Sequence, residues 1–240
     1  MPPADPGEVL VRLSGVSKGY RGLRPLRIAE LDVRVGQSVA IVGLDQVMAE
    51  VLVDLITGAT LPDAGDVVAL GRNTAEIEDP ETWLATLDGF GLLTDRAVLV
   101  EQFSVEQNLA MPLSLLLDDI HPDIRVQVAS LAEEVGLGTG GLARPAGALS
   151  QVERLRVRLG RALALGPRVL IAEHPSASLS PTESQEFAAD VARIAAARGL
   201  ASVVITADHA FARSVTSDVR VHDPSTGGLR PSSGWRRLFS

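Results

Sequence analysis

The segment SVAIVGLDQVMAEVLVDLITG (38–58) has the order of a phosphate-binding loop: an apolar strand, a turn with Gly43, and a helix. In the pattern G-x-x-x-x-G-K-[ST], glycines let backbone N–H groups approach phosphates, the lysine neutralises their charge, and the hydroxyl holds magnesium. Counted from Gly43, this chain has Met48 at the second glycine, Ala49 at the lysine and Glu50 at the hydroxyl residue. Taken alone, the segment predicts an ordinary strand, turn and helix.

A second candidate for chemistry is His174, which follows the apolar run RVLIAE (168–173). An imidazole at the end of a strand can act as a general base near neutral pH. A competing interpretation is a strand-end histidine that faces a cleft or a subunit surface, and we favour this simpler one.

The elements that must position these residues are indicated by hydrophobic periodicity. Short runs rich in Val and Ile, without alternation, are typical of strands buried on both faces of a parallel sheet. Such runs occur at 38–43, 168–173 and 201–206, and a weaker apolar run occurs at 219–223. Helices are expected at 49–58, 151–166 and 182–199, each ending at a glycine. This alternation predicts an α/β fold with a mainly parallel sheet.

Two regions depart from this alternation. Residues 9–20 and 26–36 are expected to be edge strands of an antiparallel hairpin, which opens a β subdomain (9–36). Residues 95–150 are helical and rich in loops, which predicts a helical subdomain inserted between two parts of an α/β core. We expect those core parts to be 37–94 and 151–225, with a C-terminal tail at 226–240, all within one domain that spans 1–240.

The composition excludes several classes of protein. The 240 residues carry a net charge of −8, which argues against a nucleic-acid binder, because such proteins need a basic surface. The chain has no cysteine, so disulfides and thiolate metal sites are excluded. Its longest apolar run (109–117) is too short to cross a bilayer, and the N-terminus lacks a secretory pattern. We therefore expect a cytosolic protein.

The segment ALSQVERLRVRLGRALALGPRVLIAEHPSASLS (148–180) resembles the signature-to-Walker-B block of ATP-binding cassette (ABC) ATPases. Leu149 and Ser150 match the start of the L-S-G-G-Q signature, whereas Gln151 and Val152 replace its glycines. The later matches are Arg161, Ala162, Leu163, Gly166, Pro167 and Pro175. Six landmarks occur in the family order over nearly the whole chain. The resemblance is greatest to ATPases of the macrolide-exporter and lipoprotein-release type, and it implies an ABC-type P-loop NTPase core.

The resemblance also assigns positions outside the phosphate loop. Tyr20, in VSKGY (16–20), corresponds to the aromatic residue that stacks on adenine, although an edge-strand aromatic covering the core is an alternative. Asp95 falls at the Q-loop glutamine, where it is either a permease contact or an ordinary loop aspartate. Ser150 remains at the helix N-terminus that would face the γ-phosphate bound by a second subunit.

The positions that would carry catalysis have all changed. Glu173 corresponds to the magnesium-associated aspartate and His174 to the catalytic glutamate. Ser180 corresponds to the D-loop aspartate and Ala207 to the switch histidine. The resemblance therefore implies vestigial positions and no expected catalytic residue or metal ligand.

The charge at the phosphate loop is reversed. The chain has a single lysine, Lys18, which precedes the first core strand and cannot replace the one missing at Ala49. Glu50 adds a negative charge where phosphates would lie. A charge pair about 4 Å apart is worth about 4 kcal/mol at an effective dielectric constant near 20, so this exchange disfavours a triphosphate. We expect weak ATP binding at most, supported by stacking on Tyr20, and no bound magnesium.

The resemblance implies a catalytically degenerate ABC subunit on the cytoplasmic face of the plasma membrane. Its expected partners are a second ABC ATPase chain, most simply in a heterodimer, and an integral membrane permease. The permease contact is expected along FSVEQNLAMPLSLLL (103–117), with Asp95 at its hinge. An equal alternative is that Leu109, Met111 and Leu113 pack the core of the helical subdomain itself. Two alternatives are an active ATPase with atypical motifs and an adaptor that uses the fold outside transport.

Overall fold

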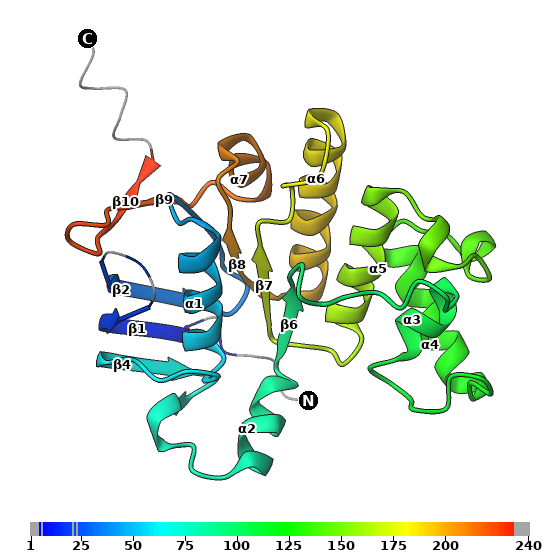
Figure 1. Ribbon diagram of the computed structural model, residues 1–240, viewed down its shortest axis with the longest axis horizontal. Coiled ribbons are helices and arrows are strands. Elements are labelled where there is room, and N and C mark those ends of the chain that lie inside the picture. The colour runs from blue at the N-terminus through cyan, green and yellow to red at the C-terminus, as the bar shows by residue number, and fades with distance from the viewer. Residues whose placement is uncertain (1–4, 6, 21, 23, 233–240) are drawn as a thin grey trace.

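The computed structural model describes residues 5, 7–20, 22 and 24–232, and its strands form two sheets (Figure 1). The expected tail therefore lies partly outside the described residues. The first sheet is antiparallel, in the order β2-β1-β4-β5. Its strands are β1 (Val9–Lys18), β2 (Leu26–Arg34), β4 (Ala64–Ala69) and β5 (Arg72–Asn73).

The second sheet has the order β10-β9-β3-β8-β7-β6 and is parallel except for the pairing of β10 with β9. Its strands are β3 (Ser38–Val42), β6 (Phe90–Leu93), β7 (Val169–Glu173), β8 (Ala201–Ile205), β9 (Val219–His222) and β10 (Leu229–Pro231). Every residue of β7 and β8 is buried, as expected for apolar runs covered on both faces. The prediction of a mainly parallel central sheet is confirmed.

Seven α-helices surround these sheets in the described part of the chain. They are α1 (Gln46–Ile56), α2 (Pro80–Leu87), α3 (Val105–Ala110), α4 (Pro122–Glu134), α5 (Gln151–Leu163), α6 (Pro181–Arg198) and α7 (His209–Val215). Short 3₁₀ turns occur at 74–76, 139–141 and 146–148.

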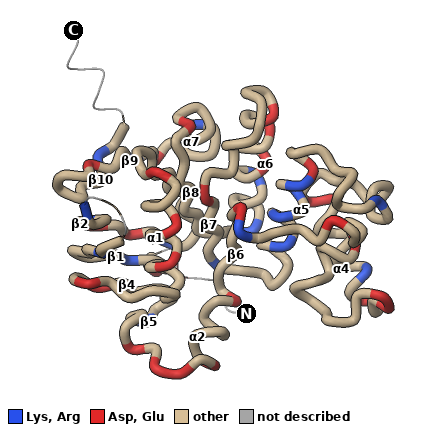
Figure 2. Tube along the Cα trace, viewed as in Figure 1, with Lys and Arg blue, Asp and Glu red and all other residues tan. Residues whose placement is uncertain are grey.

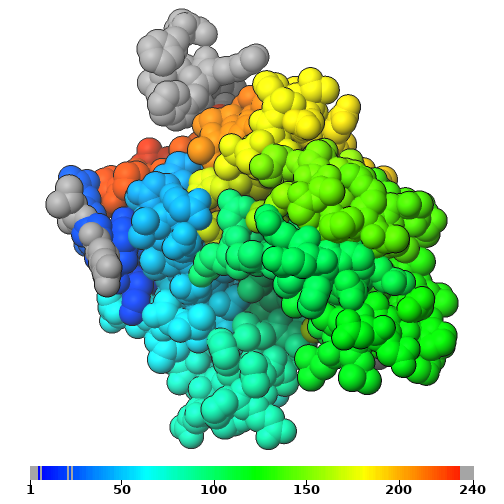
Figure 3. Space-filling model, turned by 45° about the vertical axis from the view of Figure 1, so that its right-hand side comes forward, coloured from blue at the N-terminus to red at the C-terminus, as the bar shows by residue number. Residues whose placement is uncertain are grey.

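Three hydrophobic cores divide the molecule into layers. One core contains α1, the antiparallel sheet and one face of the parallel sheet. The second covers the opposite face of the parallel sheet with α5, α6 and α7. A third core joins α3, α4 and part of α5, on the side of the molecule away from α1 (Figure 1). In Figure 3 this helical region is green, and α1, in light blue, reaches the surface on the other side.

Two sequence-based expectations need correction. β1 is not an edge strand, because it pairs with β4 as well as β2. A pairing partner about 50 residues away has no local signal in the sequence. The helix expected at 49–58 begins three residues earlier, at Gln46, because Asp45 provides an N-cap.

Candidate functional site

The turn between β3 and α1 is short, and its Asp45 side chain places a carboxylate at the N-terminus of α1. Gly43 has a φ of +93°, and a Cβ atom there would lie 3.3 Å from the carbonyl oxygen of His222. The carboxylate of Asp45 then accepts a hydrogen bond of 2.8 Å from the backbone N–H of Met48. Helix N-termini attract anions, so the Asp45 side chain occupies a position of the kind that a phosphate takes in a phosphate loop.

The lysine position of the loop pattern faces the core. Ala49 is fully buried and belongs to the hydrophobic core between the two sheets. The single lysine lies elsewhere, because Lys18 pairs with Asp63 at 2.9 Å. Glu50 is half-buried, and its carboxylate accepts a hydrogen bond of 3.1 Å from the side-chain amide of Gln46.

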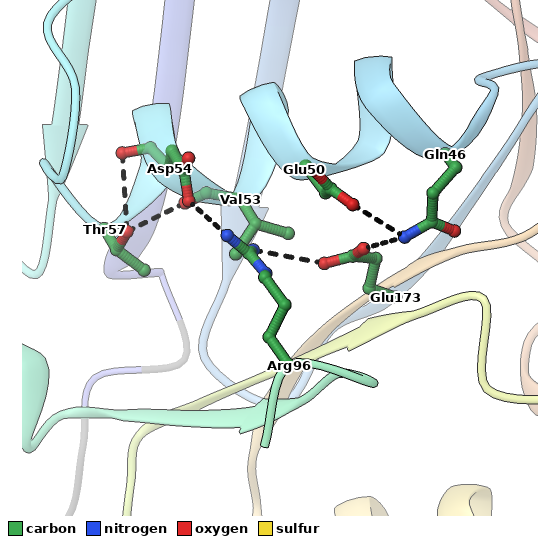
Figure 4. Close-up of polar contacts among 7 residues, drawn as sticks. All are labelled: Gln46, Glu50, Val53, Asp54, Thr57, Arg96 and Glu173. Carbon is green, nitrogen blue, oxygen red and sulfur yellow. Dashed lines mark hydrogen bonds and ion pairs between the residues drawn. The ribbon is translucent and has the colours of Figure 1, made fainter. Parts of the chain in front are cut away.

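Figure 4 shows how α1 and β7 are joined across the candidate site. The same amide nitrogen of Gln46 donates to Oε1 of Glu173, at the end of β7, over 2.5 Å. The Glu173 side chain is 1% exposed. The structure therefore brings two sequence-predicted residues, Glu50 and Glu173, together through Gln46, the first residue of α1.

A cation from the loop after β6 completes this network. Nη2 of Arg96 lies 3.2 Å from Oε2 of Glu173, and its Nη1 lies 3.0 Å from Asp54 on α1. Burial raises the pKa of the Glu173 carboxyl, and the nearby charge of Arg96 opposes that rise. A buried carboxylate is costly without a partner, and Arg96 supplies one.

Sequence reasoning missed Arg96. The only available signal was indirect: with Ala49 at the lysine position, the carboxylate of Glu173 needs another cation nearby. Among the described residues, no group of three or more Asp, Glu or His side chains is arranged to hold a metal ion.

Tyr20 borders a cavity of about 410 Å³ beside the start of α1. Asp45, Val47 and Met48 line its α1 side, and His222 lines another part of its wall. Burial, and then the neighbouring charge of Asp45, raise the pKa of the Tyr20 hydroxyl. An aromatic side chain in a partly apolar cavity suits a flat ring as ligand.

His174 has an unusual backbone and an unpaired ring nitrogen. Its φ is +44°, and its backbone N–H donates to the carbonyl of Ile205 at 2.8 Å. Its Nε2 atom is buried and has no hydrogen-bond partner within the described part of the chain. Positive φ in a residue other than glycine occurs often at functional sites, so His174 is part of the candidate site.

Comparison with known proteins identifies the family to which this architecture belongs. Residues 26–177 match the family model of the ABC transporter. The chain belongs to the ABC transporter family.

Similar ABC proteins include the lipoprotein-releasing system ATP-binding protein LolD of Chromohalobacter salexigens, 29% identical over 85% of this chain and 87% of that protein. The ABC transporter ATP-binding protein YtrE of Bacillus subtilis is 30% identical, over 82% and 85%. Among solved structures, cbiO1 from Clostridium perfringens superposes with a TM-score of 0.82 at 18% identity, covering 95% of this chain and 91% of that one. The predicted ABC cassette fold is confirmed.

The position predicted to be the ABC signature is also occupied by the chain's own side chains. Ser150 caps α5, and Glu153 reciprocates by accepting the backbone N–H of Ser150 at 2.8 Å. Arg144 donates to Glu153 at 2.6 Å, and this bond, followed by the bond from Ser150, lowers the pKa of Glu153. A carboxylate therefore lies at this helix N-terminus, as at α1.

The other residues assigned from the family resemblance have their contacts outside the network in the described part of the chain. Ala207 is exposed after β8, and His209 is exposed at the start of α7. Ser180 caps α6 and shares hydrogen bonds with Glu183.

Asp95 pairs with Arg158 on α5 at 2.6 Å, so it and the adjacent Arg96 contact different elements.

Proposed function

We propose that this chain is an ABC nucleotide-binding subunit that has lost ATP hydrolysis and serves as the structural or regulatory half of an ATPase dimer coupled to a membrane permease. The observation that carries this proposal is the network of Gln46, Glu173 and Arg96. It joins the two elements between which an ABC protein holds the nucleotide phosphates and magnesium.

The residues present do not fit a magnesium-bound triphosphate. Asp45 already accepts from the N-terminus of α1, and Glu50 adds a second negative charge nearby. Glu173 is engaged by Gln46 and by the guanidinium of Arg96, so neither of its oxygens is without a partner. Repulsion between carboxylates and phosphates in this half-buried place disfavours ATP binding.

The proposed partners follow from the family and from the relatives. The relatives include ATP-binding proteins of a lipoprotein-releasing system, which supports a transport role beside a permease. Within the described residues, no helix combines the length and the apolar character that a bilayer crossing requires. We place the chain on the cytoplasmic face of the plasma membrane, in a dimer with an intact ABC ATPase, and we assign it no nucleic-acid partner.

An active ATPase with atypical residues is the second candidate. The unpartnered Nε2 of His174, next to Glu173, favours it, because this nitrogen could act as a general base. The loss of the lysine and the engagement of Glu173 weigh against it.

A phosphate-release assay on the purified chain with ATP and magnesium separates these candidates. We expect no release above the buffer blank, while an intact ABC ATPase measured in parallel gives a clear signal. Turnover that disappears in His174→Ala and persists in His209→Ala would reject the proposal and make His174 the base. The exposed His209 is the matched control, since it is not a hydrogen-bond partner of Glu173 or Arg96.

A further inference from the structure

The C-terminal end of α4 is electrostatically unfavourable by itself. Its last two residues are Glu133 and Glu134, and its last turn has no basic residue. The C-terminal end of a helix carries a partial negative charge from its unpaired carbonyl groups, so acidic side chains there are repelled. The end of α4 therefore needs cations from another part of the molecule.

Three arginines of the neighbouring helices supply that positive charge. Arg156, on α5, donates a hydrogen bond to the carbonyl oxygen of Val135, the residue that follows α4. Arg193, on α6, donates to the carbonyl oxygen of Glu134 at 3.0 Å. Arg198, in the last turn of α6, donates to both carboxylate oxygens of Glu134, from Nε over 2.7 Å and also from Nη2. Two helices therefore hold the end of α4.

Asp190, on α6, connects two of these arginines. One of its oxygens lies 2.7 Å from Nη2 of Arg156, and the other lies 3.2 Å from Nη2 of Arg193. The side chains of Arg156, Asp190, Glu134 and Arg198 are between 16% and 26% exposed, so water screens their charges less than it screens those of a surface ion pair. We call Glu134, Arg156, Asp190, Arg193 and Arg198 the α4 clamp.

The packing around the α4 clamp is close. Gly136 has a φ of +75°, and a Cβ atom there would lie 2.2 Å from Nη1 of Arg156, so a side chain at this position would displace the guanidinium. Leu131 and Val135 belong to the core that covers the parallel sheet, whereas Val128 belongs to the core of the helical region. Helix α4 therefore contributes to both cores, and the α4 clamp holds the end that lies in the sheet core.

We infer that the α4 clamp fixes the helical region to the parallel sheet, so that the two parts move as one rigid body. Parts of a chain with separate cores commonly move relative to each other unless their interface is extensive, and this interface adds hydrogen-bonded charges to apolar packing. A contact made on the segment between α3 and α4 would then be transmitted to α6 and the sheet. The inference goes beyond the proposed function, because none of the five residues belongs to the candidate site.

Distance measurements by pulsed electron paramagnetic resonance test the inference. The chain has no cysteine, so two introduced cysteines are its only sites for spin labels. Val126→Cys on α4 and Arg213→Cys on α7 place the labels at exposed positions on the two parts. We expect one narrow distance distribution, which becomes broad in Arg156→Met/Arg198→Met because this variant leaves the end of α4 without two of its cations.

Arg12→Met/Arg34→Met is the matched control, since both arginines pair with Asp32 in the antiparallel sheet. The distribution should stay narrow in this control. Hydrogen exchange provides a second measurement: amides of α4 should exchange faster in the clamp variant, while those of the antiparallel sheet should not. A general increase in exchange would mean that the variant is unfolded, and Asp190→Asn, which keeps the size of the side chain, then replaces it.

The result that would overturn the inference is a folded clamp variant, or a folded Asp190→Asn variant in its place, with a distance distribution as narrow as that of the control. Such a variant could still have a lower melting temperature, and the α4 clamp would then stabilise the fold without restricting motion between its parts. A broad distribution in the labelled chain with an intact clamp would equally reject the inference.

Discussion

A single arginine side chain, that of Arg96, contacts carboxylates from two different elements at the centre of the candidate site. The family spacing alone indicated that Glu50 and Glu173 belong to one site. It did not indicate Arg96, because the path of the loop after β6 decides where this side chain lies. A loop path depends on packing against distant elements, and no local pattern encodes it.

We predict that Arg96→Met destabilises the protein by about 1–2 kcal/mol at pH 7. The substitution leaves the buried carboxylate of Glu173 with only the Gln46 amide, and hydrogen bonds to charged groups contribute about 1.5–3 kcal/mol. Solvent screening at the half-exposed guanidinium reduces that figure. Urea unfolding measures the free energy. Arg125→Met is the control and should change it by less than about 0.5 kcal/mol.

The same variant has a defined pH dependence. Burial already raises the pKa of Glu173 in the folded chain. The stability linked to this group is therefore fully present below its pKa in the unfolded chain. That stability is lost as the pH rises through its pKa in the folded chain. Removing Arg96 raises the folded pKa further and enlarges that loss. The destabilisation should therefore be small near pH 4 and larger at pH 7. An equal effect at both pH values would mean that Arg96 acts through packing.

At the scale of elements, local patterns predicted the helices α1, α5 and α6 and the strands β1, β2, β3, β7, β8 and β9, but not which way α1 faces. The buried runs that became β3, β7 and β8 are rich in Val and Ile, and Gly199 ends α6 in a left-handed conformation with a φ of 63°. For α1, the alignment on Gly43 placed Ala49 at the site. Because Asp45 caps α1, the helix begins at Gln46, three residues before the expected start, and Ala49 lies on its buried face.

We predict that Ala49→Lys destabilises the protein by about 3 kcal/mol or more and does not restore ATP binding. The ammonium group would enter the core between the two sheets without a partner, and burying an unpaired charge is among the most costly substitutions. Val47→Lys, on the exposed face of the same helix, is the control and should change stability by less than about 0.5 kcal/mol. Thermal unfolding and ATP calorimetry measure both effects. A stable Ala49→Lys protein with gained ATP affinity would contradict the orientation of α1.

At the scale of the whole molecule, the order of the landmarks was enough to predict the ABC cassette fold. Surface contacts were less predictable, because periodicity does not separate a buried apolar run from one that faces a partner. The expected permease contact (103–117) illustrates this. Leu109 is fully buried in the helical region, whereas Leu115 and Leu116 are 97% and 73% exposed. Figure 2 shows basic residues gathered around α5, where Asp95 pairs with Arg158.

Membrane purification of the tagged chain tests the proposed assembly. We predict that it recovers a second ABC ATPase chain and a permease, because the ABC fold is present and these leucines are exposed, while the candidate site is engaged by the chain's own residues. Leu115→Ser/Leu116→Ser should lose the permease, since two adjacent exposed leucines form an apolar patch, whereas single exposed apolar residues are ordinary. Asp95→Arg should weaken recovery too, because it exchanges an ion pair with Arg158 for repulsion between like charges.

Val126→Ser is the matched control for the leucine variant. Val126 is also exposed and lies in the same helical region, on α4, so its replacement should leave recovery of the permease unchanged. Thermal unfolding of each variant separates loss of contact from loss of fold, because none of the altered side chains is buried. Equal loss in the leucine variant and the control would show that the helical region has no specific contact at 115–116. Recovery of the unmodified chain without any membrane partner would favour the adaptor over the transport subunit, because an adaptor needs the ABC fold only as an interaction surface.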